Sequence, residues 1–149
     1  MDSRQKIKED SIKALKAGDK KMVLVLRYLT SLIDKKELSM PARTDVTEET
    51  VIEVLRKELK NKKESRVMFE KGGRDDLVAE VDSEIEILSA YLPAEISHEE
   101  IRKEVVGAIE EKGLVFGEIM KQVMAKFKGG VDGQVVSSIV NQEIAKMNG

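Results

Sequence analysis

The sequence has few of the residues on which protein chemistry usually depends. It contains no cysteine, no tryptophan and a single histidine among 149 residues. Without cysteine the chain can form no disulfide, no thiolate nucleophile and no cysteine-ligated zinc site, which fits a reducing compartment. One histidine, His98, cannot build a metal site with several histidine ligands or a histidine relay. We therefore predict no catalytic residue, no metal and no cofactor.

Aromatic residues and long apolar runs are also scarce. Aromatics make up 3% of the chain, which disfavours readout of single-stranded nucleic acid by base stacking. No apolar run approaches the ~20 residues of a membrane span, and the start, Met1-Asp2-Ser3-Arg4-Gln5, lacks the apolar stretch of a signal peptide. The sequence therefore predicts a soluble cytoplasmic protein with no membrane partner.

Charge is abundant but unevenly distributed along the chain. Although the net charge is −2, residues 1–74 carry 19 Lys+Arg against 13 Asp+Glu, which gives +6. Residues 75–100 carry no basic residue and 9 acidic ones, which gives −9, and residues 101–149 are close to neutral. The near-neutral total thus conceals a basic first half, and a nucleic-acid partner remains open.

Apolar residues recur at helical spacing through almost the whole chain, and no strand pattern is sustained. The first two predicted helices meet at Gly18-Asp19, where Gly18 ends one helix and Asp19 caps the next. Leu15 is expected on the buried face of the first helix. Because the run Met22 to Leu26 is apolar throughout, neighbours are expected to cover more than one face of the second helix.

Two longer helices complete the first half of the chain. One is predicted from Glu48 to Lys71, capped by Asp45 or Thr47. The next begins near Asp75 and is expected to turn one apolar stripe inward: Leu77, Val81, Ile85, Leu88 and Leu92. Since the residue before a proline leaves the α region, this helix must end at Tyr91-Leu92-Pro93. We place a domain boundary there, between residues 1–92 and 93–149.

Three shorter helices are predicted after this boundary. Ser97 and Glu100 have the spacing of a capping box at the start of the first. The second contains the apolar residues from Ile119 to Phe127, and the third begins after Asp132 and includes Met147. The sequence therefore predicts an all-α fold, with an N-terminal bundle of about four helices followed by a three-helix module.

Three patterns that could indicate chemistry have simpler explanations. Glu95-Ile96-Ser97-His98 matches half of a di-iron motif, but such sites need two copies on long helices. The glycines at 72–73 and in 129–133 lack the preceding strand of a phosphate-binding loop and are better interpreted as turns. The fourth helix carries carboxylates that we interpret as a solvated acidic face: Asp75, Asp76, Glu80, Asp82, Glu84 and Glu86.

A basic ridge on the third helix could contact phosphates. Arg56, Lys60 and Lys63 are spaced 4 and 3 apart and therefore project from one face. The alternative is an ordinary charged surface, because Glu53 and Glu64 can pair with neighbouring lysines, and these residues alone favour that alternative. Two further cations of this helix, Lys62 and Arg66, fall in register with its apolar stripe, at an edge or an interface.

A second basic cluster lies in the last module. It consists of Lys121, Lys126 and Lys128, with no acidic residue between Glu118 and Asp132. With so few aromatics, contacts to RNA would be mainly to phosphate and shape.

The order of several short motifs resembles the YqeY family. These motifs are Arg27, Glu58-Leu59-Lys60, Lys63-Glu64-Ser65, Gly73-Arg74-Asp75-Asp76-Leu77, Tyr91-Leu92-Pro93 and Val131-Asp132-Gly133 before Val135-Val136. The region after Pro93 is also similar to the tail of the B subunit of tRNA-dependent amidotransferases. One departure is that Lys121-Gln122 stands where the YqeY family usually has Gly-Lys.

The resemblance implies a helical accessory protein that contacts tRNA or another structured RNA. A rival interpretation is a scaffold that docks an amidotransferase or an aminoacyl-tRNA synthetase component. A third, suggested by the amidotransferase association alone, is a carbon-nitrogen ligase that uses glutamine as amido-N donor. Because the chain has no cysteine for glutaminase attack and no identifiable ATP or zinc motif, we expect no catalysis of its own.

Overall fold

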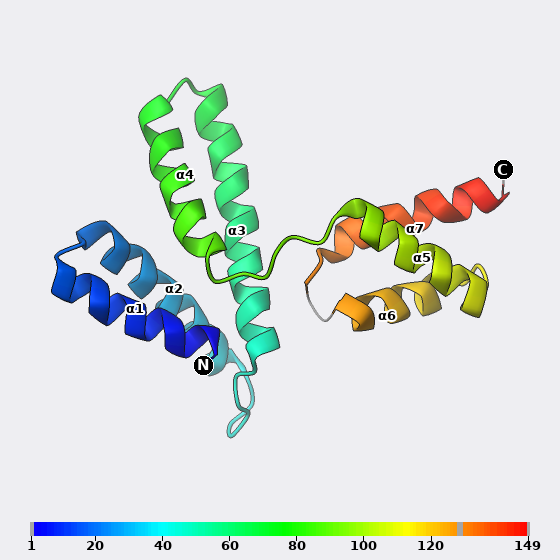
Figure 1. The fold of residues 1–149 in the computed structure, drawn as a ribbon, viewed down its shortest axis with the longest axis horizontal. Coiled ribbons are helices and arrows are strands. Elements are labelled where there is room, and N and C mark those ends of the chain that lie inside the picture. The colour runs from blue at the N-terminus through cyan, green and yellow to red at the C-terminus, as the bar shows by residue number, and fades with distance from the viewer. Residues whose placement is uncertain (1, 128–129, 149) are drawn as a thin grey trace. The chain divides into compact units, whose positions relative to one another are not determined.

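The computed structural model describes residues 2–127 and 130–148. Within these ranges the chain forms seven α-helices and no strand (Figure 1), which confirms the predicted all-α class. The contacts divide the chain into two compact units, Met1–Pro93 and Ala94–Gly149. Each unit has its own cluster of buried apolar residues. No helix in the described ranges combines the length and the apolar content needed to cross a membrane.

The first unit begins with a hairpin of two helices, α1 (Ser3–Ala17) and α2 (Lys20–Ser39). Gly18 follows α1 with φ of 74°, a left-handed conformation that glycine adopts without a steric penalty. The side chain of Asp19 then accepts a hydrogen bond from the backbone N–H of Met22. Both residues therefore have the predicted roles, because capping depends on a few neighbouring atoms of the same segment.

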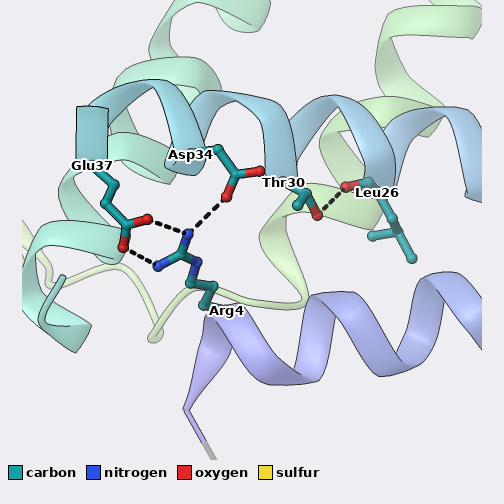
Figure 2. A network of polar contacts seen from close by, with 5 residues as sticks. All are labelled: Arg4, Leu26, Thr30, Asp34 and Glu37. Atoms are coloured by element: carbon teal, nitrogen blue, oxygen red, sulfur yellow. Dashed lines mark hydrogen bonds and ion pairs between the residues drawn. The ribbon is translucent and has the colours of Figure 1, made fainter. Parts of the chain in front are cut away.

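Arg4 links the first turn of α1 to the last two turns of α2 (Figure 2). Its guanidinium donates to Asp34 Oδ1 at 2.7 Å and to Glu37 Oε2 at 2.8 Å. The hydrogen bond from Arg4, reinforced by its charge, lowers the pKa of the Glu37 carboxyl. The Thr30 hydroxyl donates a hydrogen bond within α2, to the carbonyl oxygen of Leu26 at 2.9 Å.

The second hairpin of this unit consists of α3 (Glu48–Lys71) and α4 (Asp75–Ser89). Thr47, one of the two predicted caps, accepts a hydrogen bond from the N–H of Thr50. Gly73, with φ of 69°, turns the chain between the helices. Figure 1 shows α3 and α4 running antiparallel and the two hairpins diverging from a shared base.

The hydrophobic cluster of the first unit contains residues from all four of its helices. Its buried members are Ile7, Val25, Leu26, Leu29, Ile33, Val51, Leu55 and Leu88. Tyr91 and Leu92, which follow α4, pack against the same cluster. The Tyr91 hydroxyl donates to Asp10 Oδ2 of α1 at 2.7 Å, and Lys6 Nζ lies 5.8 Å from the centroid of the Tyr91 ring. The end of the unit is thereby attached to its first helix.

Two expectations about burial and one about a helix end need correction in this unit. Leu15 was expected on a buried face but is 58% exposed, and Leu24 is 69% exposed within a run expected to be covered on several faces. In two diverging hairpins each helix is covered only where a neighbour lies, so apolar residues on the remaining flank stay in water. Leu92 is beyond the end of α4 at Ser89, so it packs on the cluster from outside the helix.

The second unit contains α5 (His98–Lys112), α6 (Phe116–Phe127) and α7 (Gly133–Asn148). As predicted, Ser97 caps α5 by accepting from the N–H of Glu100, and Asp132 accepts from the N–H of Gln134 at the start of α7. The core includes Val105, Ile119 and Val136. Met147 was expected on the apolar face of α7 but is 54% exposed, because it lies in the last turn of the helix.

One buried charge joins two helices of the second unit. Glu143 of α7 is buried, and its Oε1 lies 2.9 Å from Arg102 Nε of α5 and 3.1 Å from Lys146 Nζ. Arg102 also donates from Nη2 to the side chain of Gln142 at 3.1 Å. These contacts supply the partners that a carboxylate needs away from water.

Candidate nucleic-acid interface

The lysines of α6 lie on the solvent side of the second unit. The helix buries Ile119 and Val123 against the core, whereas Lys121 and Lys126 are exposed. Neither lysine forms a hydrogen bond or an ion pair within residues 2–127 and 130–148. Five residues on an α-helix correspond to a rotation of about 140°, so the two ammonium groups flank the exposed face of α6.

Part of the predicted basic cluster cannot be placed in the same way. Lys128, the third lysine of that cluster, and Gly129 of the predicted glycine turn lie outside the described residues. The following Val131 is buried in the core of the unit. The candidate surface of the second unit is therefore defined by Lys121 and Lys126.

The ridge on α3 is less uniform than its spacing predicts. Lys60 and Lys63 are exposed, but Arg56 is only half-exposed. The Nε and Nη2 atoms of Arg56 are buried and have no hydrogen-bond partner within the described residues. Arg56 therefore presents less of its guanidinium to an external phosphate than an exposed arginine would, and Lys63 is the most accessible cation of this ridge that has no partner there.

Lys62 lies at the interface between helices, as its register with the apolar stripe indicates. Its Nζ lies 2.9 Å from Glu84 Oε2 of α4 and 3.5 Å from Glu58 Oε1. The same atom lies 5.6 Å from the ring centroid of Tyr28 of α2. Burial by itself would lower the pKa of the Lys62 ammonium, but the contacts with Glu84 and Glu58 outweigh it and raise that pKa. Lys62 therefore stays charged and serves the packing of α2, α3 and α4.

Arg66, one turn further along α3, is also occupied by acidic neighbours. Its Nε lies 2.5 Å from Asp82 Oδ1 of α4, and its Nη1 lies 3.1 Å from Glu70 Oε2. The hydrogen bond with Asp82 raises the pKa of the Arg66 guanidinium. Lys62 and Arg66 together show that part of the basic charge of α3 neutralises α4 and is not available to an RNA.

The acidic face of α4 is only partly neutralised by these contacts. Glu84 and Asp82 have cationic partners in α3, and Asp76 pairs with Arg74 at 3.1 Å, which lowers the pKa of the Asp76 carboxyl. Glu80 and Glu86 have no hydrogen bond or ion pair within the described parts of the chain. The helix thus keeps a negative surface beside the basic third helix.

The structure also contains a groove that the sequence interpretation did not identify. This α3/α4 groove has a volume of about 320 Å³, and Asn61 and Ser65 form part of its α3 side. A signal for it exists in the sequence. The inward stripe of α3 runs from Leu55 to Phe69 and is interrupted by polar residues at Glu58, Lys62 and Ser65. Such interruptions indicate that this part of the stripe does not face a closed apolar core.

No cluster of three or more metal-ligating side chains occurs among residues 2–127 and 130–148. His98 is an exposed residue in the first turn of α5. The side chains gathered at the surfaces described above are cations, carboxylates and amides.

The comparison with protein families gives a match over almost the entire length of the chain. The YqeY family, described as Yqey-like protein, matches residues 4–144. The chain belongs to the YqeY family. The match includes all of α2 to α6 and most of α1 and α7, so membership covers both compact units of this YqeY chain. No curated protein matches it.

Proposed function

We propose that this YqeY-family chain is a cytoplasmic accessory protein that binds tRNA or another structured RNA and performs no chemistry of its own. The observation that carries the proposal is the contrast between two groups of cations. Lys62 and Arg66 are neutralised within the fold, whereas Lys121 and Lys126 are exposed and have no partner in the described parts of the chain. The choice of tRNA as the ligand rests on the resemblance that the sequence after Pro93 suggests to the tail of the amidotransferase B subunit.

The proposed contact is electrostatic. The segment between Glu118 and Asp132 carries three lysines and no acidic residue, so an approaching phosphate meets no carboxylate within it. The described helices leave few aromatic side chains for base stacking, and phosphate contacts dominate the affinity of such proteins. Lys63, with Lys60 and Arg56 beside it on α3, provides the second surface in this proposal.

The test is equilibrium binding of the full chain to bulk tRNA across a salt series. Each neutralised phosphate contributes roughly −0.7 to −0.9 to the slope of log K against log salt, so the three lysines predict a slope of about −2 to −3. Lys121→Glu combined with Lys126→Glu is expected to reduce both the affinity and the magnitude of this slope. Lys103→Glu combined with Lys112→Glu, at two exposed lysines of α5, is the matched control. Absence of binding at low salt would disprove the proposal.

The α3 ridge is tested separately with Lys63→Glu, since that residue is exposed and its replacement disturbs no contact within the described fold. A loss of tRNA affinity smaller than that of the α6 variant is expected, because only one ridge cation is both exposed and unpaired. If tRNA affinity falls in Lys63→Glu and not in the α6 variant, the RNA-binding surface lies on the first unit and not on the second.

A second candidate function is favoured by the acidic face of α4. Here the chain is a scaffold that docks a protein, such as an amidotransferase or aminoacyl-tRNA synthetase component. Glu80 and Glu86, which have no ion-pair partner in the described ranges, are suited to a basic protein surface. A complex captured on the full chain that persists after nuclease treatment supports this function, and loss of every partner after nuclease treatment rejects it.

A further inference from the structure

The α3/α4 groove has a chemistry opposite to that of the basic surfaces. Its floor is apolar and consists of Phe69, Leu77 and Val81, whereas its rim carries the carboxylates of Glu80 and Glu84, and the lining also includes the buried Glu58. Lys62 is the single cation among the lining residues. Three carboxylates against one ammonium leave this groove with a net negative charge.

The floor of the groove is only partly covered by the fold itself. The base of the α3/α4 hairpin packs against α1 and α2 through Val51, Leu55 and Leu88. Further along the hairpin, Phe69 and Leu77 are half-buried. Covering their remaining apolar surface would be favourable at roughly 25 cal/mol for each Å² removed from water. Two antiparallel helices with an apolar strip between them form the type of surface that accepts a third, amphipathic helix.

The carboxylates at the rim of the groove favour a positively charged binding partner. Glu80 is exposed and has no ion pair within residues 2–127 and 130–148, and no Lys or Arg occurs between Asp75 and Glu100. An RNA phosphate approaching this rim would be repelled, whereas a lysine or arginine would be attracted. We propose that the α3/α4 groove binds a basic amphipathic helix of a partner protein. This deepens the docking function above and does not depend on RNA binding.

The groove also sets the length of that helix. Its lining residues on α3 extend from Glu58 to Phe69, which at ~1.5 Å per residue is about 16 Å, or about three turns. A partner helix of three to four turns would place apolar residues at i, i+3 or i+4, and i+7 over Phe69, Leu77 and Val81. Its flanking Lys or Arg residues would lie opposite Glu80, because Glu84 is already paired with Lys62.

The probe is a fluorescein-labelled peptide of about four turns, with leucines on one face, lysines on both flanks and alanines elsewhere. A second peptide of the same design carries glutamate at every lysine position. Binding to the full chain is measured by fluorescence anisotropy, and the contact surface is located by amide chemical shifts in NMR spectra of the labelled protein. We expect the basic peptide to bind, with shifts centred on residues 58–84, and the acidic peptide not to bind.

Matched variants on α4 test the role of the rim. Glu80→Lys reverses a charge that lines the groove, whereas Glu86→Lys makes the same change at an exposed residue of α4 that does not line it. We expect Glu80→Lys to weaken the basic peptide about tenfold, because it replaces attraction by repulsion at the rim. Glu86→Lys should change the affinity for the basic peptide by no more than about twofold. A charge outside the groove acts on the peptide over a longer distance, and salt screens such an interaction.

A variant that blocks the groove tests whether the peptide enters it or is held by surface charge alone. Asn61 is exposed and lines the groove, so Asn61→Trp should obstruct it without disturbing the core, and circular dichroism checks that helicity is retained. Loss of peptide binding in this variant supports the proposal.

Equal binding by all variants, equal binding of the acidic peptide, or shifts located elsewhere overturns the proposal. Shifts of residues 77–84, the α4 side of the groove, on addition of tRNA would assign the groove to RNA and also overturn it. Unchanged tRNA affinity in Glu80→Lys keeps the two functions distinguishable.

Discussion

The Tyr91–Asp10 hydrogen bond allows a quantitative prediction about the first unit. Tyr91→Phe removes only the hydroxyl that donates to Asp10 at 2.7 Å and keeps the ring beneath Lys6. A hydrogen bond to a charged group contributes about 1.5–3 kcal/mol to stability. Because Tyr91 is half-buried and water can partly replace the lost contact, we expect the free energy of unfolding to fall by about 1–1.5 kcal/mol, just below that range.

The assay is urea unfolding followed by tyrosine fluorescence. The chain has no tryptophan and two tyrosines, and both Tyr28 and Tyr91 belong to the first unit, so the signal reports on that unit alone. Tyr28→Phe is the matched control, because Tyr28 is exposed and its hydroxyl forms no hydrogen bond within the described residues. Its expected effect is below about 0.5 kcal/mol. In each variant the remaining tyrosine provides the signal.

The pH dependence of unfolding stability supplies an independent check of the Tyr91–Asp10 contact. Burial, with a further contribution from the hydrogen bond to Asp10, raises the pKa of the Tyr91 phenol above its ordinary value of 10.0. This contribution to stability is complete below pH 10.0 and decreases as the pH rises above it, since only the unfolded chain then loses the proton. The stability difference between the parent chain and Tyr91→Phe should therefore shrink between pH 9 and pH 11. A difference that does not change with pH, or that equals the effect of Tyr28→Phe, would refute this account of the contact.

Three further predictions concern other parts of the fold. Arg4→Ala should destabilise the first unit at neutral pH, and in acid titrations the difference should disappear as the pH falls below 4.5 through the lowered pKa of Glu37. Gly18→Ala should cost about 1 kcal/mol in urea unfolding because of its left-handed backbone, whereas Gly107→Ala, in a helix with open space at the Cβ position, should stabilise the second unit by about 0.5–1 kcal/mol. Ile119→Ala, fully buried in the second unit, should cost about 2–5 kcal/mol measured by circular dichroism and leave the tyrosine signal unchanged.

Features that depend on neighbouring residues could be predicted from the sequence. Gly18, Asp19 and Ser97 all have the predicted capping roles, because a cap is decided by side chains and backbone groups within one turn. The helix from Glu48 to Lys71 has the predicted bounds for the same reason. The all-α class follows from many such local signals that agree along the chain.

Features that depend on the arrangement of helices could not be predicted in the same way. Periodicity assigns Leu24 to an apolar run but does not say which neighbour covers it, and in two diverging hairpins that flank remains exposed. The same limit applies to the candidate interface. The spacing of Arg56 with Lys63 predicts a shared face, yet Arg56 is only half-exposed and its Nε and Nη2 atoms are buried. RNA contact by this surface stays a prediction.

The contact between Tyr91 and Asp10 also bears on the order in which the chain can fold during synthesis. It joins residues separated by 81 positions, and Leu88 of α4 belongs to the same cluster as Ile7 of α1. A nascent chain that ends before residue 88 therefore lacks part of the core of its first unit and leaves Asp10 without its partner. The hairpin of α1 and α2 can form early, since its contacts are local. The first unit can be completed only when almost its whole length has left the ribosome, and the helices of the second unit are then still to emerge.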